Sequence, residues 1–133
     1  MKKEYENLSA EELYKIADDY LVHDSDNSMD LVLELLAKSA ELGYVEAQYL
    51  LGCIYYDGEG TEIDTDLAYK YLEMAVEHNH PDALNYMGKY YFHVEGDYDK
   101  ALDYYNQALE AGCKDVDDED LSTLANYDFY KND

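Results

Sequence analysis

Small and large hydrophobic residues recur along the chain with the three-and-four spacing of amphipathic helices. Three segments carry the same version of this stripe, with large residues in the middle and a small residue near the end: 32–40, 68–76 and 101–109. The spacing places these side chains on one face of a helix. Small residues let a neighbouring helix approach closely and large residues fill the wider gaps, so we expect each segment to pack against another helix.

A second motif interleaves with the first and occurs four times. In each copy a large apolar residue precedes a small one, and the small residues are separated by 35, 36 and 37 positions: Ala17, Gly52, Gly88 and Ala125. Three residues later stand Tyr20, Tyr55, Tyr91 and Asp128, and one further on Leu21, Tyr56, Phe92 and Phe129. A repeat of this length is typical of stacked two-helix units that bury their stripes only against neighbouring units.

Helix-boundary signals agree with this division. Ser9 and Glu12 form a capping-box motif, Gly43 and Gly112 stand where left-handed helix ends are expected, and Pro81 opens a helix. The predicted fold class is all-α, in a single domain over residues 1–133. We predict seven helices, near 9–22, 30–42, 46–57, 66–78, 82–93, 98–111 and 118–130.

At these residues the chain resembles the Sel-one-like repeat family, a branch of the tetratricopeptide superfamily. The resemblance is carried by the inter-repeat turn 39–48, and by Ala47-x-x-x-Leu51-Gly52-x-x-Tyr55-Tyr56-x-Gly58-x-Gly60-Thr61, Asp66-x-Ala68 and His80-Pro81-Asp82-Ala83. The third unit departs from the pattern, because its stretch from Phe92 to Ala101 is three residues shorter than the stretch from Tyr56 to Ala68. The resemblance implies a right-handed α-α superhelix (solenoid) of about three helix hairpins plus a C-terminal capping helix. It also implies a function as adaptor, scaffold or inhibitor.

The resemblance further places the candidate binding residues, because in such stacks the first helix of each hairpin lines the concave face. Equivalent positions form three ladders: Glu11, Glu46, Asp82 and Glu119; Tyr14, Tyr49, Asn85 and Ser122; Asp18, Cys53, Lys89 and Asn126. We expect the partner to contact Glu11, Tyr14, Asp18, Glu46, Tyr49, Cys53, Asp82, Asn85 and Lys89. Tyrosine suits protein recognition, and the carboxylates around it favour a partner that carries lysine or arginine. The alternative is structural, since acidic residues in a first turn stabilise the helix dipole and tyrosines on packing stripes belong to the core.

Charge narrows the possible partners. The 133 residues include 32 Asp and Glu against 9 basic residues, all lysine, which gives a formal net charge of −23. Such a surface repels nucleic acid and anionic lipid and attracts basic proteins. We therefore expect a basic protein partner, no nucleic acid, no membrane and a monomer when free. The alternative is that the charge serves solubility alone.

Motifs for catalysis or metal binding are weak. His78-x-His80-x-Asp82 has ligand-like residue types but matches the turn of the family, and the acidic stretch 24–28 lacks the glycine and glutamate of a calcium loop. Cys53 and Cys113 form no paired motif, and we find no phosphate loop or nucleophile elbow. We expect no enzyme activity, no metal and no cofactor. With no leader-like or membrane-spanning run, we expect a cytoplasmic protein.

Two functions remain open at this stage. The first is a scaffold or adaptor that presents an acidic, tyrosine-rich surface to a protein partner, which the repeats favour. The second is a bacterial immunity or inhibitor protein that neutralises a basic toxin, such as a nuclease, by one-to-one binding. The charge favours this second function.

Overall fold

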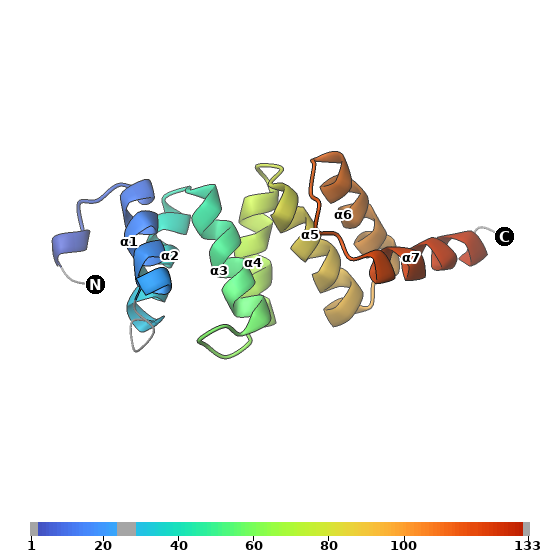
Figure 1. Ribbon diagram of the computed structural model, residues 1–133, viewed down its shortest axis with the longest axis horizontal. Coiled ribbons are helices and arrows are strands. Elements are labelled where there is room, and N and C mark those ends of the chain that lie inside the picture. The colour runs from blue at the N-terminus through green and yellow to red at the C-terminus, as the bar shows by residue number, and fades with distance from the viewer. Residues whose placement is uncertain (1–2, 24–28, 132–133) are drawn as a thin grey trace. The chain divides into compact units, whose positions relative to one another are not determined.

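The computed structural model describes residues 3–23 and 29–131, and within these ranges the chain forms helices and no strand. The elements in chain order are the 3-10 helix η1 (Lys3–Tyr5), α1 (Ala10–His23), α2 (Met29–Glu41), α3 (Val45–Asp57), α4 (Thr65–Val76), α5 (Pro81–Lys89), the π-helix η2 (Tyr90–Glu95), α6 (Tyr98–Glu110) and α7 (Asp118–Lys131) (Figure 1). All seven α-helices lie within a few residues of their predicted bounds, except that the helix predicted over 82–93 is α5 continued by η2. The all-α class is therefore confirmed over these residues.

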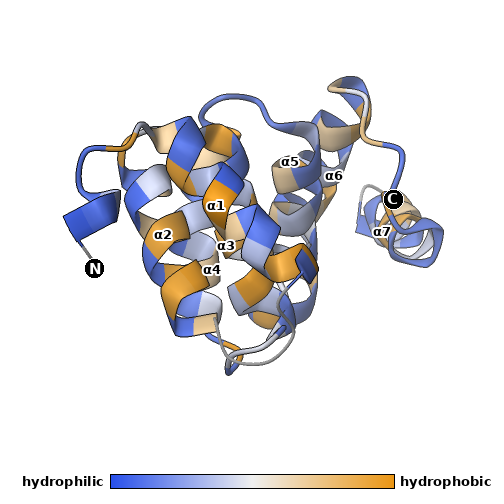
Figure 2. Cartoon of the chain, turned by 60° about the vertical axis from the view of Figure 1, so that its left-hand side comes forward, coloured by the Kyte–Doolittle hydropathy of each residue, from blue (hydrophilic) through white to orange (hydrophobic). Residues whose placement is uncertain are grey.

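The chain divides into two compact units, Met1–Ala75 (unit 1) and Val76–Asp133 (unit 2). In unit 1, α1 and α2 form an antiparallel pair, as do α3 and α4 (Figure 1). Hydrophobic and hydrophilic residues alternate along α1 and α2 (Figure 2), as expected for helices with one buried face. The core of unit 1 consists mainly of residues from the two predicted stripes, including Leu13, Ala17, Leu35, Leu36, Ala40, Leu51 and Ile54.

Buried polar side chains join neighbouring helices in unit 1. The Ser39 hydroxyl of α2 donates a hydrogen bond to the Ala10 carbonyl of α1 at 2.6 Å. The Gln48 amide of α3 donates to the Ala40 carbonyl of α2 at 3.1 Å. Both side chains are buried, so each bond satisfies a polar group that water cannot reach and fixes the register of two helices.

Glycine at the repeated small position brings the helices of a hairpin close together. A Cβ on Gly52 of α3 would lie 2.7 Å from the side chain of Leu72 on α4. In unit 2, a Cβ on Gly88 of α5 would lie 2.6 Å from the ring of Tyr105 on α6. Glycine is therefore required at both positions by the close approach of a large side chain from the second helix.

The helix boundaries use the residues that the sequence indicated. The Glu12 backbone N–H donates to the Ser9 hydroxyl at 3.1 Å, and the Ser9 N–H donates to the Glu12 carboxylate at 3.3 Å, which confirms the capping box. His80, considered above as a ligand-like residue, caps α5 by accepting a hydrogen bond from the Ala83 N–H at its Nδ1. Pro81 follows it at the start of the helix.

The helix predicted over 82–93, the first helix of the third hairpin, ends differently from the prediction. Residues 90–95 form a π-helix, in which the helical turn is wider than in an α-helix. At its end the backbone N–H groups of Gly96 and Asp97 both donate to the Tyr91 carbonyl. The Tyr90 hydroxyl donates to the Glu95 carboxylate at 2.7 Å across this turn. This wide turn leads into α6 and accounts for the stretch from Phe92 to Ala101, which is three residues shorter than its counterpart from Tyr56 to Ala68.

Gly52→Ala is expected to lower the free energy of unfolding by about 1 kcal/mol, because overpacking against Leu72 outweighs the preference of a helix for alanine over glycine. Urea unfolding followed by circular dichroism measures the change. In a Leu72→Ala background the same substitution should stabilise the protein, since the overlapping atoms are gone. Equal losses in both backgrounds would contradict the close-approach explanation.

Candidate protein-binding site

In unit 1, α1 and α3 are the first helices of their hairpins, and they bring predicted ladder residues together. Tyr14 of α1 lies partly buried against Tyr44, with ring centroids 5.0 Å apart and a tilt of 43° between the ring planes. Tyr44 directly precedes α3 and immediately follows the left-handed Gly43 at the end of the inter-repeat turn. Asp18 follows Tyr14 by one turn of α1, and Glu46 lies in the first turn of α3. We refer to Tyr14, Asp18, Tyr44 and Glu46 as the α1–α3 face.

Electrostatics shows that these four groups are close. Burial raises the pKa of the Tyr14 phenol above its ordinary value of 10.0, and the charges of Asp18, Glu46 and Tyr44 raise this pKa further. A carboxylate from α1 and one from α3 therefore act on the same phenol, because a phenolate would be repelled by both. The Asp18 and Glu46 side chains are exposed, so they remain accessible to a partner.

Other predicted residues of unit 1 lie on the same helices. Glu11 is exposed and forms an ion pair with Lys15 one turn later, at 3.2 Å. Tyr49 and Cys53 of α3 are partly exposed. Tyr44 was missed by the sequence analysis, although its place in the inter-repeat turn, two residues before Glu46, could have indicated it.

In unit 2 the corresponding residues Asp82 and Asn85 form hydrogen bonds with the segment that follows α6. The Cys113 thiol donates to the Asp82 carboxylate at 3.3 Å, and burial raises the pKa of this thiol. Asn85 is only 3% exposed, and its amide donates to the Asp115 carbonyl at 3.4 Å. Segment 113–115 therefore occupies the face of α5 on which the sequence predicted a partner. Lys89 lies over the ring of Tyr86, with its Nζ 4.7 Å from the ring centroid.

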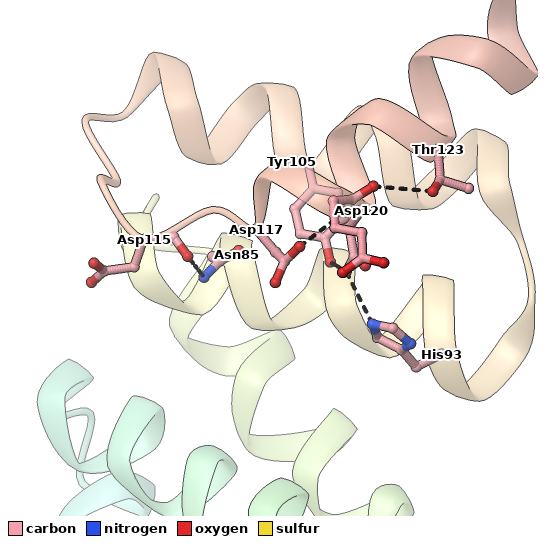
Figure 3. A network of polar contacts seen from close by, with 8 residues as sticks. Asn85, His93, Tyr105, Asp115, Asp117, Asp120 and Thr123 are labelled. Carbon is pink, nitrogen blue, oxygen red and sulfur yellow. Dashed lines mark hydrogen bonds and ion pairs between the residues drawn. The ribbon is translucent and has the colours of Figure 1, made fainter.

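Helix α7 is attached to unit 2 through a buried carboxylate (Figure 3). Asp120 is only 9% exposed, and its Oδ2 accepts a hydrogen bond from the Tyr105 hydroxyl of α6 at 2.7 Å. The same oxygen lies 3.0 Å from Nε2 of His93, on η2. Asp117 caps the helix by accepting from the Asp120 N–H at 3.0 Å. Asp120 is therefore buried, whereas Asp117, Asp118 and Glu119 before it are exposed.

The exposed ladder positions of α7 are Glu119, Ser122 and Asn126. Over residues 3–23 and 29–131, no group of three or more histidine, cysteine or acidic side chains is arranged to hold a metal ion. The acidic stretch Asp24–Ser28 lies outside the described residues. No helix in the described part of the chain is long and apolar enough to cross a membrane.

Comparisons with known proteins agree with the repeat geometry. The sequence model of the Sel1 repeat, the Sel-one-like repeat named above, matches residues 45–80 and 81–113, just over half of the chain. A crystal structure of a Sel1 repeat protein from Oxalobacter formigenes is similar at 29% identity, with a TM-score of 0.67 over 79% of this chain and 43% of that one. An immunity protein from Pseudomonas aeruginosa is similar at 20% identity, with a TM-score of 0.45 over 77% of this chain and 53% of that one. The chain thus spans about half the length of these solved structures.

These matches bear on the fold class. The all-α solenoid class is confirmed by the seven α-helices of the described residues together with the similarity to the Oxalobacter formigenes protein. The number of hairpins and the single domain over 1–133 stay predictions.

Neutralising a carboxylate of the α1–α3 face should lower the pKa of Tyr14. We expect both Asp18→Asn and Glu46→Gln to shift it toward 10.0, because each removes a charge that disfavours the phenolate. The raised pKa also means that the contribution of Tyr14 to stability is fully present below about pH 10 and is lost as the pH rises further, since the folded state binds the proton more tightly. NMR titration of tyrosine labelled at Cζ measures the pKa. Glu11→Gln is the control and should leave the Tyr14 pKa unchanged; an equal shift in all three variants would contradict the proposed geometry.

Tyr105→Phe should destabilise unit 2 by about 1–3 kcal/mol, because the buried Asp120 carboxylate loses its hydroxyl donor. Urea unfolding measures the change. Tyr130→Phe removes the same atom from a side chain that is 72% exposed and serves as the control. Identical unfolding midpoints for the two variants would show that the Tyr105 bond contributes nothing.

Proposed function

Because the chain belongs to the Sel1 repeat family, whose repeats are protein-interaction modules of a non-catalytic scaffold type, we propose that it binds a basic protein through the α1–α3 face. In this proposal the two tyrosines supply the contact area, and Asp18 and Glu46 select lysine or arginine side chains. The remaining partner-binding residues predicted in unit 1, Glu11, Tyr49 and Cys53, extend the contact along α1 and α3.

The observation that carries the proposal is the convergence of charge on Tyr14. Tyr14 and Tyr44 pack at 5.0 Å, and carboxylates from two helices raise the pKa of the Tyr14 phenol. A tyrosine held by packing loses little conformational entropy on binding, and its hydroxyl can still form a hydrogen bond with a partner. A lysine or arginine placed beside Tyr14 would be attracted by two carboxylates, Asp18 of α1 and Glu46 of α3.

In unit 2 this proposal gives Asp82 and Asn85 a structural role. Their contacts with Cys113 and Asp115 already fill the face of α5. A partner that reached Asn85 would have to displace segment 113–115. Lys89 carries the opposite charge to the proposed site and lies over Tyr86, so it does not contribute to the selection of a basic partner.

A second candidate function is inhibition of a basic toxin, such as a nuclease, by one-to-one binding. The observation in its favour is the net charge of −23, built from 32 acidic residues and 9 lysines without arginine. A surface of this kind speeds the encounter with a basic protein, and the acceleration falls as salt screens the charges. A scaffold needs no such net charge over the whole chain and predicts several partners.

Reversing two charges on the α1–α3 face should slow association with the partner more than the same reversal elsewhere. The partner is first captured from a lysate of the source organism on the immobilised protein at low and at moderate salt, identified by mass spectrometry, and purified. Association rates are then measured for Asp18→Lys with Glu46→Lys. We expect the association rate to fall at least tenfold, because like charges oppose each other at the contact.

The matched control is Glu41→Lys with Glu73→Lys, which changes the net charge equally at exposed residues of α2 and α4. Equal losses in both double variants would leave a general charge effect and refute the site. A single stoichiometric partner released by salt would favour the inhibitor, and several partners would favour the scaffold.

A further inference from the structure

Equivalent positions of the repeat lie on the face where the first helix of a hairpin packs against the second helix. On α3, Gly52 lies against Leu72 of α4, and Tyr55 stacks on Tyr71 with ring centroids 6.3 Å apart. This face therefore comprises the small position and the position three residues after it.

Unit 2 repeats these contacts and adds one. Gly88 lies against Tyr105 of α6, and Tyr91 stacks on Tyr104 at 5.4 Å. The position four residues after the small one also takes part, because Phe92 stacks on Tyr98 at 5.1 Å. In unit 2 three positions thus face α6, and two of them match the positions of α3 that face α4.

Helix α7 carries the same register. Its small residue is Ala125, followed at the third and fourth positions by Asp128 and Phe129. All three side chains are exposed, and Phe129 is exposed to 69%. We refer to Ala125, Asp128 and Phe129 as the α7 open face.

A different side of α7 attaches it to unit 2. Asp120 and Leu124 are buried, and Tyr127 meets Tyr98 of α6 edge to face with centroids 5.3 Å apart. At 100° per residue, Ala125 and Phe129 point well away from this side. The contacts that hold α7 therefore leave the α7 open face exposed to solvent.

We propose that the α7 open face docks an amphipathic helix of a basic protein partner, in the place that a second helix occupies in the other hairpins. A large residue of the incoming helix covers Ala125, as Leu72 covers Gly52, and an apolar residue stacks on Phe129. This surface is separate from the α1–α3 face, and its proposal stands whether or not that face binds.

Charge identifies the incoming helix. Where α3 and η2 have Tyr55 and Tyr91, α7 has Asp128, so an arginine or lysine replaces the aromatic residue on the incoming helix. The first turn of α7 adds two further exposed carboxylates, Asp118 and Glu119. A second copy of this chain does not suit this face, because two molecules of charge −23 would each bring Asp128 to the contact.

The test uses a peptide built from α6, the helix that covers the same face in unit 2. The probe is a fluorescently labelled peptide of residues 97–111 with four basic substitutions, Asp99→Lys, Asp103→Lys, Tyr104→Lys and Glu110→Lys, which keeps its Ala101, Tyr105 and Ala108 stripe. Anisotropy titrations at fixed salt measure its affinity for the full chain. We expect saturable binding that weakens at least tenfold in Phe129→Ala and in Asp128→Lys.

Ile63→Ala is the matched control, because Ile63 is an apolar side chain of similar exposure, 64%, that belongs to neither proposed face. It should leave the affinity unchanged. Circular dichroism confirms that the variants fold, which is expected because the side chains of Asp128, Phe129 and Ile63 are exposed.

Three results would overturn the proposal. One is equal binding of a scrambled peptide of the same composition, which would show attraction by charge alone. Another is no binding, or equal affinities for Phe129→Ala and Ile63→Ala. The third is a concentration-dependent dimer, detected by analytical ultracentrifugation and abolished by Phe129→Ala, which would assign the face to a second copy of the chain.

Discussion

The contact between a helix glycine and one large side chain of the next helix sets the spacing on which the hairpins depend. Where Leu72 lies over Gly52, the two helix backbones approach more closely than any side chain at position 52 would allow. That separation in turn places Tyr55 and Tyr71 at a stacking distance of 6.3 Å. A larger residue at position 52 would part the helices along their whole contact and open gaps beside the aromatic rings. The repeated small residue is thus the constraint, and the aromatic pairs around it are its consequence.

The acidic charge of the chain is tolerated because most carboxylates stay in water. Over residues 3–23 and 29–131 the buried carboxylate is Asp120, whose Oδ2 is satisfied by Tyr105 and lies beside His93. Burying a carboxylate is unfavourable unless it is hydrogen-bonded, so this arrangement is specific to the position where α7 begins. The first turn of a helix also favours a negative charge, which supports Asp120 further. A chain of charge −23 therefore uses one of its surplus carboxylates to attach its last helix.

The local signals in the sequence predicted the helices well because each has a local cause. The capping box at Ser9 and the helix start at Pro81 act within one turn, so no knowledge of distant contacts is needed. The π-helix at 90–95 was not predicted, since the sequence showed only that the connection after Phe92 was short. A short connection can be closed by trimming a loop or by widening the last helical turn. The choice depends on the Tyr90–Glu95 bond and on packing against α6.

The candidate site was predicted in part for a related reason. Tyr14, Asp18 and Glu46 followed from the repeat register, which assigns equivalent positions to one face. Tyr44 lies outside that register, in a turn, and only the folded chain brings its ring to Tyr14. Likewise no repeat position indicated that segment 113–115 would cover Asp82 and Asn85, because that segment has no counterpart in the earlier units.

The repeat also separates structural residues from candidate functional ones. A position that keeps its residue type and is buried in successive units, such as Gly52 and Gly88, is explained by packing alone. A position that changes type and is exposed is not explained in this way. Asp128 stands where two tyrosines stack in the preceding units, and Phe129 beside it keeps the aromatic character of Phe92, which stacks on Tyr98. Phe129 packs edge to face on Tyr130, so two exposed aromatic rings lie together, and the carboxylate next to them does not interfere with a basic partner. The combination of a retained aromatic residue and a new charge is therefore better explained by binding than by the folding of this chain, because folding requires neither of them to be exposed.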